Sequence, residues 1–330
     1  MSRSGPAEYR GTAAVSVVLR ILSGRQGFMV LLAFNREKNM SQKILITGTN
    51  SGFGRLTALA LARRGHTVFG TMRDISGRNR AAADELRTLA EKEGLKLHVV
   101  QMDLDNDASV ESALQDVLGR SEYLDVVVNN AGYSALGLEE TLTPAQLLEQ
   151  LNVNVVGPHR VMRAVLPSMR ARGKGYFIQI SSMVGRLVFP FMGAYVASKL
   201  ALEGLSDAYR YELKPTGVEL TVLQPGPHPT EFRSRLTPGK DQDRAAGYGP
   251  LANGLEFMEK AFESMLTGPA AQDANAVPEA LVKLIESPAG TRPGRLLVDK
   301  YNPEGITALN KAHDEVQKGL LTAMGMGNLV

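Results

Sequence analysis

From Lys43 onward, short apolar runs rich in β-branched residues alternate with longer stretches of helical periodicity. The apolar runs are mostly continuous, as in Val126-Val127-Val128, which is the pattern of strands buried on both faces. Strands are predicted at 43–47, 67–71, 97–101, 124–129, 176–181, 219–224 and 295–299, and helices at 55–64, 81–93, 108–118, 144–170, 193–213 and 278–286. This alternation predicts an α/β fold in which a mainly parallel, doubly wound, seven-stranded sheet carries helices on both faces.

Residues 1–39 have a different pattern. Their apolar stretch is interrupted at Arg20 and at 23–26, so no run reaches the roughly 20 residues that cross a bilayer. Before Arg36 this stretch contains four arginines and one acidic residue, Glu8, a charge balance that is compatible with a targeting segment. We favour an extension upstream of a start at Met40, because a strand follows almost at once. Residues 1–39 are therefore predicted to be a poorly ordered extension, and 40–330 a single domain without stable membrane insertion.

The composition of the chain argues against nucleic-acid binding and excludes cysteine chemistry. The chain carries 37 basic and 34 acidic side chains, a net charge of +3, which is too balanced to predict a nucleic-acid partner. Cysteine is absent, which excludes disulfides, thiolate catalysis and Cys-ligated metals, and we expect no metal site. The lack of cysteine is compatible with the reducing cytoplasm, which is the location that we expect.

A glycine-rich turn joins the first strand to the first helix. Its sequence, residues 47–54, is Thr-Gly-Thr-Asn-Ser-Gly-Phe-Gly. These glycines let the backbone turn tightly and approach a pyrophosphate, and the helix N-terminus offers free N–H groups to the anion. Contacts with a dinucleotide are therefore predicted for Thr47, Gly48, Asn50, Ser51, Gly52, Phe53 and Gly54.

The ends of the following strands indicate which dinucleotide binds. NAD enzymes usually place an acid at the end of the second strand, where it binds the ribose 2′-hydroxyl. Here Met72 occupies that place and Arg73 follows, and a guanidinium can pair with a 2′-phosphate. We therefore predict NADP(H) in preference to NAD(H); the neighbouring Asp74 argues slightly against it, and a solvated surface arginine is the alternative. Further cofactor contacts are predicted for Asp103, Leu104, Asn130, Ala131 and Gly132.

Tyr195 and Lys199 are four residues apart, which places both side chains on one face of a helix. A free phenol has a pKa of about 10 and is a poor acid or base at neutral pH. A nearby ammonium favours the phenolate and lowers that pKa, which would make a proton donor that works near neutral pH. This spacing is common on helix surfaces, so the prediction depends on the residues around it.

Taken together, these motifs resemble the short-chain dehydrogenase/reductase family. The resemblance covers 42–299 and includes, in the family's order, 47–54, 129–132, Asn154 in Asn-Val-Val-Gly, Ser182, Tyr195 with Lys199, and Pro225-Gly226 leading to Thr230. Ser182 precedes Tyr195 by thirteen residues, as the family's pattern expects. Residues 277–295 are similar to the branch of hydroxysteroid- and retinol-dehydrogenase-like enzymes. The resemblance implies a single-domain, Rossmann-type oxidoreductase that acts on CH–OH groups.

The resemblance also implies a catalytic tetrad of Asn154, Ser182, Tyr195 and Lys199. Tyr195 would exchange a proton with the substrate oxygen, and Ser182 would donate a hydrogen bond to that oxygen. Lys199 would lower the pKa of Tyr195 and bind the nicotinamide ribose. Asn154 would hold a water that connects Lys199 to solvent.

Two of the tetrad residues have a neighbour of the same type that could take their role. Asn152 lies close to Asn154, and Ser181 adjoins Ser182, but the family's motif and the spacing from Tyr195 favour Asn154 and Ser182. The implied cofactor contacts also include Tyr195, Lys199, Pro225, Gly226 and Thr230, the last through the nicotinamide amide. His228 is predicted to be a surface residue of its loop.

Apolar residues at 187–192 and 255–262 predict a hydrophobic substrate pocket, although several of them could simply fill the core. Residues 238–250, rich in glycine and charge, predict a mobile loop within a covering segment at about 231–255. The favoured substrate is a hydrophobic ketone, aldehyde or secondary alcohol, and Arg73 favours reduction.

Two other functions stay open at this point. A protein of this fold can sense NADP(H) without catalysis, but such regulators tend to lack the tyrosine or lysine that are present here. Catalysis on a sugar nucleotide would need a larger region after Thr230 than this chain has.

A homodimer or homotetramer that pairs the helices of Asn154 and Tyr195 is plausible by the same resemblance.

Overall fold

The computed structural model of the protein describes residues 41–231, 236–269 and 271–330. The contacts of the chain divide it into two units, residues 1–39 and 40–330. The predicted poorly ordered extension at 1–39 lies outside the described residues, as does 232–235 of the predicted covering segment.

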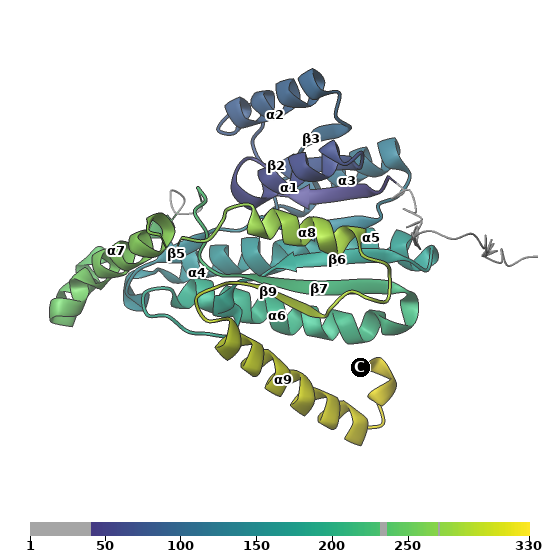
Figure 1. Ribbon diagram of the computed structural model, residues 1–330. Helices are drawn as coiled ribbons and strands as arrows, with labels where there is room; N and C mark the ends of the chain where they lie inside the picture. Colours follow the sequence, from purple (N-terminus) through teal and green to yellow (C-terminus); the bar gives the residue numbers. More distant parts are fainter. Residues whose placement is uncertain (1–40, 232–235, 270) are drawn as a thin grey trace, which may run out of the picture. The chain divides into compact units, whose positions relative to one another are not determined.

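The second unit is built on a seven-stranded parallel sheet (Figure 1). Its strands are β1 (Lys43–Thr47), β2 (Thr67–Met72), β3 (Leu97–Gln101), β4 (Val126–Asn129), β6 (Gly175–Ile180), β7 (Val218–Pro225) and β9 (Arg295–Val298). They follow the order β3-β2-β1-β4-β6-β7-β9, and every pairing is parallel. These bounds lie close to the predicted ones, and the predicted parallel sheet is confirmed.

Helices cover both faces of this sheet, which confirms the doubly wound prediction. The main covering helices are α1 (Gly52–Arg63), α2 (Arg80–Glu93), α3 (Asp107–Ser121), α5 (Gly157–Ala171), α6 (Gly193–Leu213) and α8 (Ala276–Glu286). Apolar side chains of α1, α2 and α8 pack on one face, and those of α3, α5 and α6 on the other. Because both faces are covered, Ile44, Leu45 and Ile46 in β1 are fully buried, which accounts for the continuous apolar runs.

The long helix predicted at 144–170 is interrupted. It consists of α4 (Pro144–Leu151), a π-helical turn η2 (Asn152–Val156) and α5. Within the turn, the Asn154 side chain donates hydrogen bonds to the Tyr133 carbonyl and to Ser198 Oγ, both at 3.0 Å. Such turns are frequent at functional sites, and hydrophobic periodicity does not detect the one additional residue that they contain.

Several elements lie outside the predicted set. A two-stranded parallel sheet pairs β5 (Ser134–Leu136) with β8 (Leu236–Pro238), and α7 (Gly254–Thr267) and α9 (Pro303–Ala323) extend beyond the central layers (Figure 1). The short helical turns are η1 (Glu139–Thr141), η3 (Met183–Gly185), η4 (Lys214–Thr216), η6 (Gln242–Asn253) and η7 (Gly327–Leu329). The loop predicted at 238–250 is therefore wrong in part, because η6 occupies most of it.

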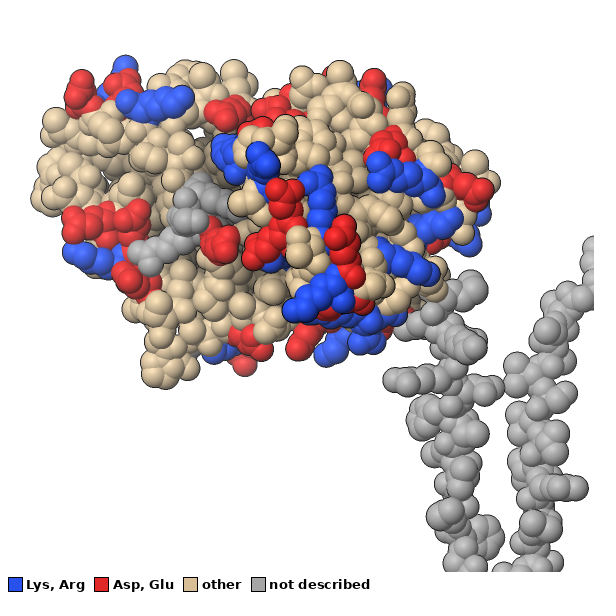
Figure 2. Space-filling model, turned by 90° about the horizontal axis from the view of Figure 1, so that it is seen from above, with Lys and Arg blue, Asp and Glu red and all other residues tan. Residues whose placement is uncertain are grey.

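The described surface agrees with the balanced charge. On the face shown in Figure 2, Lys and Arg side chains alternate with Asp and Glu. Among the helices of the described residues, none combines the length and the apolar character that crossing a membrane requires.

Candidate active site

A cavity of about 1450 Å³ opens along the carboxyl ends of the central strands. Residues that follow β1, β4, β6 and β7 line it, together with side chains of α6 and α7. The chain continues from β1 to one side of the sheet and from β4 to the other, and the gap between such strands is where open α/β sheets bind ligands.

The glycine-rich turn forms one end of the cavity. Gly48 has φ +73° and Gly52 has φ +54°, a left-handed backbone that other residues rarely adopt. A Cβ on Gly48 would lie only 2.8 Å from Ala131 Cα, so the turn fits closely against the end of β4. The cavity is lined here by Gly48, Asn50, Ser51, Gly52 and Phe53, at the N-terminus of α1.

Thr47 and Gly54 belong to this turn but do not line the cavity. Thr47 Oγ1 accepts the backbone N–H groups of Asn130 and Ala131, each at 3.0 Å. A Cβ on Gly54 would overlap the Gly48 carbonyl. Both residues therefore support the shape of the turn from behind, whereas direct cofactor contacts were predicted for them. Asn130, Ala131 and Gly132 do line the cavity.

Two arginines lie at the same end. Arg73, for which a contact with a 2′-phosphate was predicted, lines the cavity, and so does Arg78, for which no role was predicted. Asp74 does not line the cavity, and its carboxylate accepts the Arg78 backbone N–H at 2.7 Å. Asn79 joins this segment to the glycine-rich turn, since it donates to the Arg73 carbonyl at 2.6 Å and accepts from Asn50 at 2.8 Å.

Asp103 and Leu104, for which cofactor contacts were predicted, also line this end. Burial raises the pKa of Asp103, and the charge of Asp105 adds to the rise, whereas Arg73 opposes it. This effect of the Arg73 charge on Asp103 indicates that the two side chains lie near one another at this end of the cavity.

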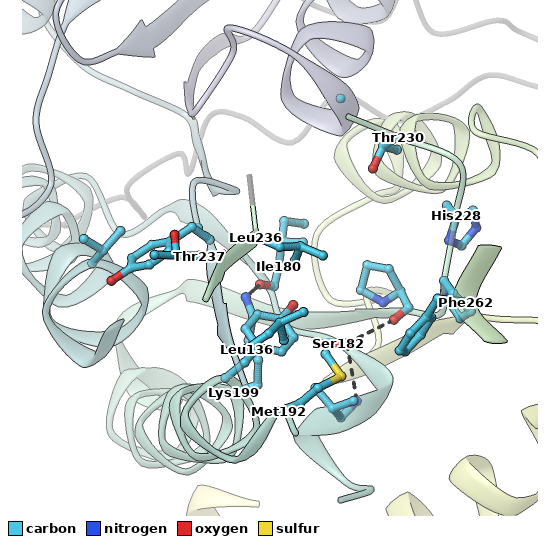
Figure 3. Close-up of a pocket in the computed structure, with 18 of the residues that line it drawn as sticks. Leu136, Ile180, Ser182, Met192, Lys199, His228, Thr230, Leu236, Thr237 and Phe262 are labelled. Carbon is cyan, nitrogen blue, oxygen red and sulfur yellow. Dashed lines mark hydrogen bonds between the residues drawn. The ribbon is translucent and has the colours of Figure 1, made fainter. Parts of the chain in front are cut away.

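Three of the four tetrad residues, Ser182, Tyr195 and Lys199, line the cavity together. Figure 3 shows two of them, Ser182 and Lys199. The hydroxyls of Ser182 and Tyr195 share a hydrogen bond, and Lys199 Nζ lies 5.6 Å from the centroid of the Tyr195 ring. Lys199 Nζ donates to the Ile180 carbonyl at 2.8 Å. Ser182 also accepts the Val184 backbone N–H at 3.3 Å, which fixes its hydroxyl at the start of η3.

Asn154 lies behind the cavity wall. A Cβ on Gly132 would lie 3.2 Å from Asn154 Oδ1 and 3.8 Å from Lys199 Nζ, so Gly132 separates the two side chains. Asn152 instead accepts from Arg160 at 2.8 Å, away from the cavity. Of the two asparagines, the structure therefore brings Asn154 toward Lys199.

Burial controls the proton affinities at this point. It raises the pKa of Tyr195 to about 12, and the hydrogen bond from Ser182 opposes the rise. It lowers the pKa of Lys199 to about 8, and the negative charge of Glu203 opposes that change. The net shift of the Tyr195 pKa is therefore upward, opposite to the predicted one, because loss of solvent around the phenol has a larger effect than any stabilisation of the phenolate by Lys199. Tyr195 holds its proton at neutral pH, as a proton donor must.

The other end of the cavity is apolar. Figure 3 shows Ser182 between Leu136 and Met192 on one side and Phe262 of α7 on the other. The remaining apolar residues of this end are Met183, Val184, Phe189, Phe191, Leu236, Leu251, Phe257, Met258, Met265 and Leu266. Most come from η3 and α7, and the apolar pattern of the sequence alone could not separate them from core positions.

The segment after β7 closes the cavity. Pro225, Gly226 and Thr230, for which cofactor contacts were predicted, line it. His228 is only 6% exposed and contacts the edge of the Phe53 ring, with ring centroids 5.5 Å apart, so the predicted surface position is wrong. Burial lowers the pKa of His228, which keeps the imidazole neutral.

Comparison with known proteins agrees with this geometry. The model of the family described as short chain dehydrogenase matches residues 42–241. The chain is 36% identical over 224 residues to a 3-ketodihydrosphingosine reductase of Bacteroides thetaiotaomicron, which covers 66% of this chain and 76% of the relative. It is 33% identical over 261 residues to retinol dehydrogenase 8 of Homo sapiens, which covers 76% and 78% of the two chains.

A solved structure shows the same fold. The short-chain dehydrogenase from Streptomyces avermitilis superimposes with a TM-score of 0.68 at 27% identity, over 86% of this chain and 96% of that one. The family match covers more than half of the chain and includes the glycine-rich turn, Ser182, Tyr195 and Lys199. The chain therefore belongs to the short-chain dehydrogenase family, whose members are oxidoreductases that act on carbonyl and alcohol groups.

Proposed function

We propose that the protein is an NADP(H)-dependent reductase that converts an apolar ketone or aldehyde to the alcohol, with Tyr195 as the general acid. One observation carries this proposal: the hydrogen-bonded hydroxyls of Tyr195 and Ser182 lie in a cavity with arginines at one end and apolar side chains at the other. The unit that performs the reaction is proposed to be residues 40–330.

The residues at the nucleotide end suit a dinucleotide that carries an additional phosphate. Gly48 and Gly52 shape a backbone cradle at the N-terminus of α1, which favours a pyrophosphate. Within residues 41–231, 236–269 and 271–330, neither Arg73 nor Arg78 forms an ion pair, although most other arginines there do. Two guanidiniums that form no ion pair within these residues support a 2′-phosphate as their partner.

In this proposal the protein residues control the proton and the substrate oxygen. A bound dinucleotide would supply the hydride for the carbonyl carbon. Tyr195 donates its phenolic proton to the oxygen, so that C=O becomes CH–OH. Ser182 donates a hydrogen bond to the same oxygen and stabilises the charge that develops there. The Lys199 ammonium stabilises the phenolate that remains on Tyr195.

Carbonyl reduction is expected to slow as pH rises through about 8, because Lys199 loses its proton there. Below this pH the ammonium is charged and stabilises the Tyr195 phenolate; above it the amine is neutral. Tyr195, with a pKa of about 12, keeps its proton across the same range. The measurement is kcat/KM for reduction as a function of pH, which reports the free enzyme. A rate that increases with pH across this range would contradict the assignment.

The substrate class is inferred from the apolar end of the cavity. One relative is named for the reduction of a 3-keto sphingoid compound and another for retinol, and these names also point to apolar substrates. The lid over this end is proposed to be the segment from β8 to α7. Its first part is fastened to the body, since Gln146 donates to the Pro238 carbonyl at 2.9 Å and accepts the Lys240 N–H at 3.0 Å.

A panel of carbonyl compounds with NADPH, followed by absorbance of the reduced nicotinamide, tests this function. Long-chain and polycyclic ketones and aldehydes are expected to be reduced, because the cavity beyond Ser182 is apolar. Turnover only with small, highly charged sugars would reject the substrate class. NADPH binding without turnover of any compound would favour the alternative, a non-catalytic NADP(H) sensor.

A further inference from the structure

One turn after Lys199 on α6, the carboxylate of Glu203 is buried at 1% exposure. It accepts hydrogen bonds from Ser181 Oγ at 2.7 Å, from Gln224 Nε2 at 2.8 Å and from Arg295 Nε at 3.3 Å. A buried carboxylate is unfavourable unless such partners surround it. The proposed reaction does not use this group, so its burial requires another explanation.

The partners of Glu203 lead to the C-terminal helix α9. Arg186 Nη2 lies 3.3 Å from Glu203 Oε2, and Arg186 Nε donates to Asn310 Oδ1 at 2.9 Å. Asn310 in turn donates to Gln224 Oε1 at 2.7 Å. Arg295 pairs with Asp314 at 2.8 Å. We refer to Ser181, Arg186, Glu203, Gln224, Arg295 and Asn310 as the Glu203 cluster. It joins α6, the segment around Ser182, β7, β9 and α9 through buried polar contacts.

The cluster determines the position of the segment that carries Ser182. Ser181 points its hydroxyl to the carboxylate, while the next residue, Ser182, shares a hydrogen bond with Tyr195. On extended backbone, adjacent side chains face opposite ways, so holding Ser181 orients Ser182. A Cβ on Gly185 would overlap the Glu203 carboxylate, so η3 rests directly on this group.

The charge of Glu203 also reaches the active site. The other charged or titratable groups that face the cluster are Arg186, Asp207, Arg210, Arg295, His313 and Asp314. Three guanidiniums there face three carboxylates when Glu203 is counted, so removing its charge leaves an uncompensated cation. On the other side lies Lys199, whose pKa Glu203 raises against the effect of burial.

We propose that Glu203 is a positioning residue of the active site. It holds the segment that carries Ser182 in position, favours the charged form of Lys199 and connects both residues to α9. This role rests on the proposed function, because Ser182 and Lys199 act in the reaction assigned above. Glu203 touches neither substrate nor cofactor in this scheme and acts only through these neighbours.

Glu203→Gln separates this role from simple packing, because it keeps the shape and removes the charge. The variant is expected to lower the pKa of Lys199, followed by NMR of ¹³C-labelled lysine with Lys199→Arg to identify the signal. The pH at which carbonyl reduction slows should fall with it, and kcat should decrease about tenfold or more. The matched control is Glu219→Gln, which breaks an ion pair with Arg292 away from the cavity. An unchanged Lys199 pKa in Glu203→Gln would overturn the proposal.

Two further variants keep the proposal testable if Glu203→Gln does not fold. Glu203→Asp keeps the charge, so the pKa of Lys199 should stay closer to that of the wild type than in Glu203→Gln. Asn310→Ala removes the hydrogen-bonded contact with α9 and keeps the pair of Arg295 with Asp314, so it should raise KM for the carbonyl and leave the pKa of Lys199 unchanged. An unchanged KM in Asn310→Ala would reject a role of Asn310 in connecting the active site to α9. The NMR measurement needs no turnover, so a wild type without reductase activity would reject the proposed function and still leave the Lys199 result decisive.

Discussion

Replacing Tyr195 with phenylalanine is expected to lower kcat for carbonyl reduction about a thousandfold, within the range known for removal of a general acid. Only the phenolic oxygen is lost, and that oxygen carries the proton for the substrate. The ring stays, so the packing of Tyr195 against its apolar neighbours is retained. The Kd for NADPH should remain close to the wild-type value, because the nucleotide end of the cavity is unchanged.

The measurement is steady-state reduction of the best carbonyl from the panel, together with a fluorescence titration of NADPH. Tyr209→Phe is the matched control, since it removes one hydroxyl from the same helix α6 outside the cavity. That hydroxyl contacts His159 Nδ1 at 2.6 Å, so a small loss of stability is expected without a change in kcat. Retained turnover in Tyr195→Phe would reject the proton-transfer role.

Replacing Arg73 with alanine is expected to weaken NADPH binding by about 10- to 150-fold, which corresponds to a charged hydrogen bond of about 1.5–3 kcal/mol. Binding of NADH should change little, because NADH lacks the 2′-phosphate. Arg78→Ala should act in the same direction, since Arg78 lines the same end of the cavity. Higher salt should reduce the effect of both variants, because the two arginines are exposed.

Isothermal titration of both dinucleotides, with wild type and each variant, gives the comparison directly. Arg170→Ala is the matched control, because it removes the same charge from the last turn of α5, away from the cavity. Equal losses of NADPH and NADH affinity in Arg73→Ala would show that the 2′-phosphate assignment is wrong.

The central part of the fold could be predicted because local pattern and burial agree. Continuous apolar runs such as 126–128 occur where helices cover both faces of the sheet, so sequence alone located the strands. Tyr195 and Lys199 could be paired because helical geometry fixes residues four apart on one face. The choice of Asn154 over Asn152 agrees with the geometry, in which only Asn154 lies beside Gly132.

What could not be predicted depends on contacts between distant segments. The burial of Glu203 depends on Arg295 and Gln224, which lie on other elements. Arg78 reaches the cavity because Asp74 folds the turn after β2, and no periodic pattern marks such a turn. The raised pKa of Tyr195 follows from its loss of solvent, which is a property of the packed structure.

The pairing of β5 with β8 has a consequence for how this enzyme can be altered. The backbone N–H groups of Gly239 and Asp241 donate to the carbonyls of Leu136 at 3.1 Å and Thr141 at 3.0 Å. These bonds attach the covering segment to β5 and η1 just after β8. The apolar side chains of η6 and α7 come only after this attachment. A mutant library confined to 251–266 would therefore explore new substrates while the reacting groups keep their geometry, which makes this segment the natural starting point for directed evolution.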